Sequence, residues 1–134
     1  MKWSVLLLMA VALVVWAATA WAHTSRVAVA PTAYAFVNAN GTLWSAQTNG
    51  VTGIKHPERG IYCFKLATPA NNAVASVNPQ GLAGTAVVMP FLPGGPSGGA
   101  SLSGCPSGYQ DASARVSRVS GALANAGFYI VFTS

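Results

Sequence analysis

Side chains capable of acid–base chemistry are few in this 134-residue chain. Its only carboxylates are Glu58 and Asp111, and a hydrolase with paired carboxylates would need the two to meet across the fold. Both lie in polar, turn-like contexts, where a solvated charge is the ordinary role. A Ser-His-Asp triad would need His56, Asp111 and a serine, but the chain has no Gly-x-Ser-x-Gly elbow to present the nucleophile. We therefore expect no catalytic residues and no enzymatic activity.

His23 raises the question of a metal site. If processing leaves His23 at the amino terminus, its α-amino nitrogen and its imidazole can bind one copper ion, with His56 as the second histidine. Some extracellular β-sandwich proteins bind copper in this way. Imidazole-rich copper sites generally require more ligands than this chain supplies. We therefore expect no metal or other cofactor, and keep a small extracellular enzyme or copper-binding protein that uses His23 as the alternative hypothesis.

The basic residues do not form a nucleic-acid site. The formal net charge is +5, mainly because acidic residues are scarce. Lysines and arginines are spread along the chain and never stand next to one another, whereas a phosphate-binding surface needs them clustered. We expect no nucleic-acid partner and at most a weak attraction to an anionic cell surface.

Two cysteines, Cys63 and Cys105, are expected to form a structural disulfide. An even number of cysteines favours pairing in an oxidising compartment, and two cysteines allow only one intramolecular connection. Neither has a Cys-x-x-Cys neighbour that would indicate a redox or metal pair. The bond would attach a loop rich in Gly, Pro and Ser, residues 93–108, to a strand.

The amino-terminal segment predicts export. Lys2 precedes an almost uninterrupted apolar run, residues 3–22, that ends in Ala20-Trp21-Ala22. This order is typical of a secretory signal peptide, with cleavage expected after Ala22 and, as the second choice, after Ala20. A run of about 20 apolar residues can also remain as an uncleaved membrane anchor. We expect a signal peptide over residues 1–22 and a single secreted or extracytoplasmic domain over residues 23–134, membrane-anchored if the signal is not cleaved.

Short apolar stretches separated by turn residues predict an all-β domain. Asn40-Gly41 is a strong hairpin signal, and Ile61–Leu66 is the clearest strand, with Tyr62, Phe64 and Leu66 on one face. The polar segment 56–60 is expected to end the strand before it. The expected strands cover residues 34–37, 42–45, 51–55, 61–66, 73–77, 85–91 and 127–133.

Residues 111–126 are ambiguous on periodicity alone. Val116, Val119 and Leu123 have helical spacing, whereas Ala112, Ala114 and Val116 alternate with polar residues as in a strand. Gly121 would cost a helix roughly 1 kcal/mol relative to alanine. Both interpretations remain open at this point.

The order of four motifs, YAFVNANGT, GIYCFKL, CPSG and GFYIVF, resembles an uncharacterised small exported β-sandwich domain found in bacterial proteins. The resemblance covers nearly all of residues 23–134. It implies an antiparallel β-sandwich of about seven or eight short strands, a Cys63–Cys105 disulfide, and a strand over the ambiguous segment. It implies no activity.

The aromatic residues are expected to be mostly core. Trp44 and Tyr109 stand next to predicted turns and are the candidates for a carbohydrate-stacking or protein-contact surface. We therefore expect an exported, non-enzymatic structural or surface-interaction module. Its partner would be a cell-surface or extracellular protein or a glycan, and its binding residues are not predicted.

Overall fold

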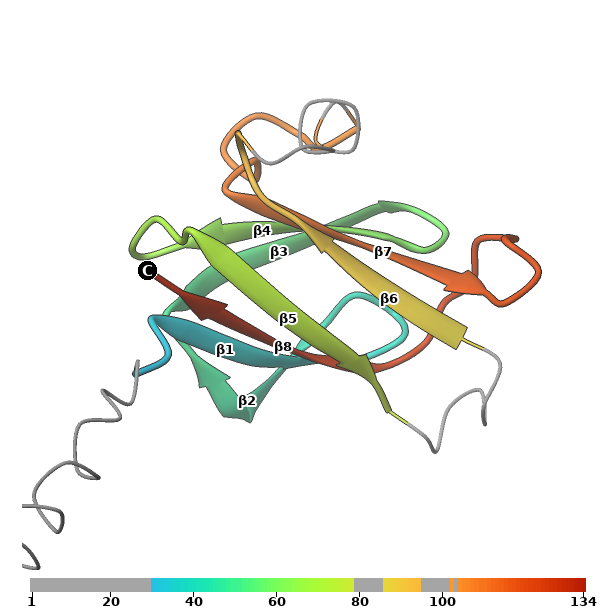
Figure 1. Ribbon diagram of the computed structural model, residues 1–134, viewed down its shortest axis with the longest axis horizontal. Coiled ribbons are helices and arrows are strands. Elements are labelled where there is room, and N and C mark those ends of the chain that lie inside the picture. Colours follow the sequence, from blue (N-terminus) through green and yellow to red (C-terminus); the bar gives the residue numbers. More distant parts are fainter. Residues whose placement is uncertain (1–29, 79–85, 95–101, 103) are drawn as a thin grey trace, which may run out of the picture.

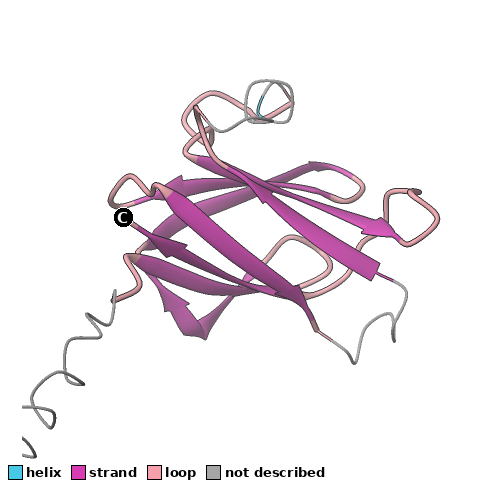
Figure 2. Cartoon of the chain, in the orientation of Figure 1, coloured by secondary structure: helices cyan, strands magenta, loops and turns pink. Residues whose placement is uncertain are grey.

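The computed structural model describes residues 30–78, 86–94, 102 and 104–134. Every named element in this part is a strand, and two antiparallel sheets pack against each other (Figures 1 and 2). The all-β sandwich expected from the sequence is confirmed. The predicted signal segment, residues 1–22, and His23 lie outside the described residues. The eight strands are β1 (Ala33–Val37), β2 (Leu43–Asn49), β3 (Val51–Glu58), β4 (Ile61–Leu66), β5 (Asn72–Val77), β6 (Ala86–Phe91), β7 (Ala112–Arg118) and β8 (Phe128–Thr133).

The two sheets have four strands each. Sheet A has the order β2-β1-β8-β5, and sheet B has the order β3-β4-β7-β6. The chain changes sheets between β2 and β3 at Gly50, which has a φ of 71°. A Cβ at this position would lie 2.7 Å from the Thr32 carbonyl oxygen, so the passage needs a residue without a side chain. On the opposite side of the sandwich, β5 lies beside β6 (Figure 1).

The core lies between the sheets and is built largely from phenylalanine and alanine. The ring of Phe64 on β4 contacts the rings of Phe128 and Phe132 on β8, with centroids 6.4 and 5.7 Å apart. On β1 the inward positions are the small side chains of Ala33, Ala35 and Val37. Small residues suit this strand because the neighbouring β8 supplies the large rings.

Two local expectations need correction or completion. The polar segment 56–60 does not end the third strand at residue 55, because β3 continues to Glu58 with a register irregularity between Lys55 and Glu58. The ambiguous segment forms strand β7 followed by a turn, so the period-two interpretation was right. Gly121 in that turn has a φ of 88°, which a helix cannot contain.

The disulfide between Cys63 and Cys105 is confirmed. It joins β4 to the loop before β7 across a Cα–Cα distance of 5.6 Å. Cys63 faces away from the core, and both cysteines are buried. The side-chain amide of Gln110 donates a hydrogen bond to the Cys105 carbonyl at 3.0 Å. The bond therefore holds this loop against the outer side of sheet B.

Candidate functional site

Charge is divided unequally between the two sheets. Of the strands that the structure describes, the four in sheet A contain no charged residue. The charged strand residues all belong to sheet B: Lys55, Glu58, Lys65, Arg115 and Arg118. Depletion of charged residues together with enrichment of aromatic ones marks the centres of protein binding surfaces. The outer side of sheet A is therefore the candidate site.

Six large apolar side chains share this outer side and form what we call the aromatic face. Strand pairing places them together, because Tyr34 is opposite Val131, and Phe36 is opposite Tyr129. Most are exposed despite their size: Trp44 is 47% exposed and Tyr129 is 43% exposed. The members are Tyr34 and Phe36 on β1, Trp44 on β2, Val74 on β5, and Tyr129 and Val131 on β8.

The aromatic rings of this face support one another. The ring centroid of Phe36 is 5.7 Å from that of Trp44 and 4.6 Å from that of Tyr129. Because these two rings cover it, Phe36 is only 7% exposed although it points away from the core. Aromatic pairs of this geometry contribute roughly 0.5–1.5 kcal/mol beyond the area they bury. Trp44 and Tyr129 are thus held by packing on regular strands.

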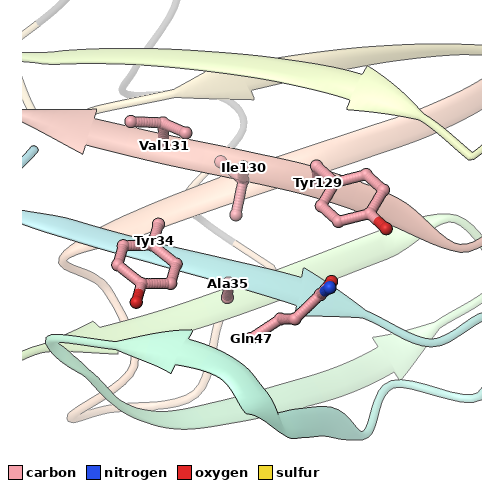
Figure 3. A pocket seen from close by; sticks show the side chains of 6 residues that line it. All are labelled: Tyr34, Ala35, Gln47, Tyr129, Ile130 and Val131. Carbon is pink, nitrogen blue, oxygen red and sulfur yellow. The ribbon is translucent and has the colours of Figure 1, made fainter.

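A shallow cavity of about 230 Å³ lies on this face. Its lining comes from strands β1, β2 and β8, and Figure 3 shows the rings of Tyr34 and Tyr129 apart, with the Gln47 side chain reaching over β1. The lining residues are Tyr34, Ala35, Gln47, Tyr129, Ile130 and Val131.

Gln47 carries the one unusual polar group of this cavity. Its side-chain oxygen Oε1 is buried and has no hydrogen-bond partner among the residues that the structure describes. Leaving a buried acceptor unpaired costs about 1–3 kcal/mol. Such a group is rare in folded proteins, and because this oxygen has almost no accessible surface, a ligand in the cavity does not reach it unless the Gln47 side chain moves.

The two aromatic residues that the sequence marked for binding do not form a common surface. Trp44 lies on the aromatic face of sheet A, as expected for a contact residue. Tyr109 lies on the outer side of sheet B, against Gly53, where a Cβ would come within 2.9 Å of its ring. The Lys55 ammonium is 5.5 Å from the Tyr109 ring centroid. Tyr109 therefore helps to hold the disulfide loop on sheet B.

The structure does not bring together the residues considered for hydrolysis. Glu58 pairs with Ile61 at the start of β4, whereas the Asp111 carboxylate accepts a hydrogen bond from the Leu66 amide at its end, at 2.8 Å. At the usual rise of a strand these backbone positions are about 17 Å apart. Paired carboxylates in glycosidases are roughly 5–9.5 Å apart.

His56 has structural partners. Its Nε2 is 3.2 Å from the Asn125 side-chain oxygen, and its ring packs edge-on against Tyr62 with centroids 4.4 Å apart. Within residues 30–78, 86–94, 102 and 104–134, no three His, Cys, Asp or Glu side chains are placed to hold a metal ion. The copper hypothesis also needs His23, which is outside this part of the chain.

Tyr62 has a buried phenol that joins the two sheets. Its hydroxyl donates a hydrogen bond of 3.0 Å to the Ala39 carbonyl in the turn between β1 and β2. Burial raises the pKa of Tyr62 to about 12, against a smaller opposing effect of the Ala126 backbone. The hydroxyl therefore remains protonated and holds the turn at physiological pH.

Sequence reasoning missed Tyr34, Gln47 and Tyr129. The one local signal was the absence of charged residues from the strands that contain them.

For the described residues, no helix is long and apolar enough to cross a membrane. The chain matches no protein-family model, no curated protein and no solved structure.

Proposed function

We propose that this protein is an exported, non-enzymatic module that binds an uncharged extracellular partner through the aromatic face. The observation that carries this proposal is the contrast between the two sheets. Exposed Trp and Tyr side chains lie on a sheet without charge, while every charged strand residue of the described part lies on the other sheet. Trp and Tyr provide large contact areas with little loss of side-chain entropy on binding.

Two features support an extracytoplasmic location. The disulfide between Cys63 and Cys105 persists in oxidising compartments. The apolar run over residues 3–22 has the layout of a signal peptide. A partner on the outside of the cell is therefore the natural one for this face.

Co-sedimentation with the insoluble cell-envelope fraction of the source organism tests the proposal. Val131→Lys places a charge on the aromatic face, and Val87→Lys is its matched control on sheet B, since the two valines are 40% and 45% exposed. Val131→Lys should reduce the sedimented fraction severalfold, and Val87→Lys should leave it unchanged. Val74→Lys, at a position 66% exposed, repeats the test on edge strand β5. Equal sedimentation of all variants and the wild type would refute the proposal.

A further inference from the structure

The turn between β1 and β2 contains a chemically reactive pair of residues, Asn40-Gly41 (Figure 1). In such a pair the glycine amide nitrogen can attack the side-chain carbonyl carbon of the asparagine, because glycine has no side chain to block the approach. A second pair, Asn49-Gly50, lies at the end of β2. Both asparagines are exposed, and both glycines have a positive φ, 82° at Gly41 and 71° at Gly50. The second pair is therefore an internal control for the first.

The side-chain oxygen of Asn40 accepts two hydrogen bonds from Thr42. The Thr42 amide donates at 3.1 Å, and the Thr42 hydroxyl donates at 2.8 Å. The side-chain amide of Asn38 donates to the same hydroxyl oxygen at 3.0 Å, which orients the hydroxyl proton toward Asn40. Among the described residues, the Asn49 side chain makes no hydrogen bond. Two oriented donors on the carbonyl oxygen thus distinguish Asn40 from Asn49.

These donors lie where negative charge develops during the attack. As the Gly41 nitrogen adds to the side-chain carbon Cγ of Asn40, the carbonyl oxygen becomes an oxyanion. Donors that already point at this oxygen stabilise the transition state, as in the oxyanion hole of a hydrolase. Both hydrogen bonds span Gly41, so they also hold the Asn40 carboxamide over the peptide unit that attacks it. This arrangement lowers the entropic cost of closing the ring.

One hydrogen bond of the turn opposes the reaction. The Gly41 amide donates to the Asn38 carbonyl at 2.9 Å, and this bond must open before the nitrogen can attack. Exposed turns are among the parts of a fold that open at low cost in free energy. The base of the hairpin can stay closed meanwhile, because the Asn38 amide donates to the Thr42 carbonyl at 2.8 Å. The required opening is therefore local.

We propose that Asn40 is a site of self-modification, at which Thr42 accelerates cyclisation of the asparagine onto the Gly41 nitrogen. The bond between Gly41 N and Asn40 Cγ forms, and the bond between Cγ and Nδ2 breaks. Nδ2 leaves as ammonia and takes up, through the solvent, the proton that the Gly41 nitrogen loses. Water then opens the succinimide ring at either carbonyl and leaves an aspartyl or isoaspartyl residue at position 40. The reaction consumes only water and needs no enzyme.

Modification at this position changes a turn that is fixed to sheet B. The Ala39 carbonyl accepts the hydrogen bond from the Tyr62 hydroxyl, and a Cβ at Gly41 would collide with the Cβ of His56. An isoaspartyl residue adds one methylene group to the backbone and one negative charge. The closely packed turn cannot take up this extra length without a shift against Tyr62 and His56.

Ageing of the folded protein and of the urea-unfolded protein at neutral pH tests the proposal. Peptide mass spectrometry measures the conversion of Asn40 and Asn49 separately, and the unfolded chain gives the intrinsic rate of each pair. The ratio of the folded rate to the unfolded rate should be severalfold higher for Asn40 than for Asn49.

Thr42→Val tests the role of the hydroxyl donor, because it keeps the shape of the side chain and the backbone amide. It should slow the conversion of Asn40 about three- to tenfold, less than the roughly 10²–10³ found for a donor in a water-excluded active site. Thr42→Ser retains the hydroxyl and should keep the wild-type rate. Asn49 should convert at the same rate in all three proteins.

Two results would overturn the proposal. A ratio for Asn40 equal to or below that for Asn49 would mean that the hydrogen bonds of the turn protect Asn40. Unchanged or faster conversion of Asn40 in Thr42→Val would show that the hydroxyl does not promote the reaction. Both results are independent of the proposed function, because none of these substitutions alters the aromatic face.

Discussion

The rings of Phe36 and Tyr129 pack 4.6 Å apart, centroid to centroid, on the outer side of sheet A. They belong to opposite positions of the paired strands β1 and β8. Phe36 is covered by its neighbours, whereas Tyr129 remains 43% exposed. One aromatic side chain thus supports another that faces solvent. An arrangement in which a buried ring positions an exposed one suits a binding surface that is formed before its ligand arrives.

Gln47→Leu should not destabilise the protein. The substitution removes a buried acceptor that has no partner in the described structure and replaces it with an apolar group of similar size. We expect the free energy of unfolding to stay the same or to rise by about 1 kcal/mol. Urea unfolding measures it. A loss of more than about 1 kcal/mol would show that the Gln47 amide contributes to the fold.

The double substitution Cys63→Ala and Cys105→Ala should lower stability substantially. The disulfide spans a sequence separation of 42 residues, and the chain-entropy model gives about 4 kcal/mol for a loop of that length. Thermal unfolding followed by circular dichroism should show a drop of roughly 15–30 °C in Tm. A double variant as stable as the parent would contradict the structural role of the bond.

Two glycines with positive φ should differ in their tolerance of alanine. At Gly121 (φ 88°) nothing lies within 4 Å of a new Cβ. Gly121→Ala should therefore lower stability only by the cost of holding alanine at a positive φ, about 1–2 kcal/mol. At Gly50 (φ 71°) the Cβ would also meet the Thr32 carbonyl at 2.7 Å. Gly50→Ala should therefore cost clearly more, about 3 kcal/mol or above. Denaturant unfolding of both variants measures the two losses in free energy of unfolding. Equal losses would contradict the close approach of the Gly50 and Thr32 backbones.

Stability should fall between about pH 10 and pH 12 because of Tyr62. Its pKa is raised to about 12 in the folded protein and is near 10 in the unfolded chain. In that interval the folded state retains a proton that the unfolded state has lost, so the free energy of unfolding decreases as pH rises, by at most about 1.4 kcal/mol per pH unit. Below pH 10 the contribution is fully present. The Tyr62→Phe variant should lack this loss of stability. Identical slopes of the free energy of unfolding against pH for variant and wild type would contradict the prediction.

Much of the fold follows from local patterns in the sequence. The alternation in Ile61–Leu66 correctly placed Tyr62, Phe64 and Leu66 on one face of β4, and the structure shows that this face meets the core. Asn40-Gly41 correctly indicated the hairpin between β1 and β2, where Gly41 has a φ of 82°. These features depend on residues close in sequence, which is why they could be predicted.

The candidate site depended on long-range pairing that no local pattern contains. Alternation shows that Tyr34 and Phe36 share one side of β1, but it does not show which side faces the core. Size favours the aromatic side, yet the structure buries Ala33 and Ala35, since the rings of β8 fill the space between the sheets. Likewise, nothing near Trp44 or Tyr109 indicates that the two side chains lie on the outer sides of different sheets.

Hydroxyl-radical footprinting of the protein bound to the cell-envelope fraction tests the central claim most directly, because it reports the solvent access of individual side chains. Tyr129 and Met89 are each 43% exposed in the free protein, on sheets A and B respectively. The account predicts that binding protects Tyr34, Trp44 and Tyr129 from oxidation and leaves Met89 as reactive as before. Protection of Met89 with unchanged oxidation of Trp44 and Tyr129 would contradict it.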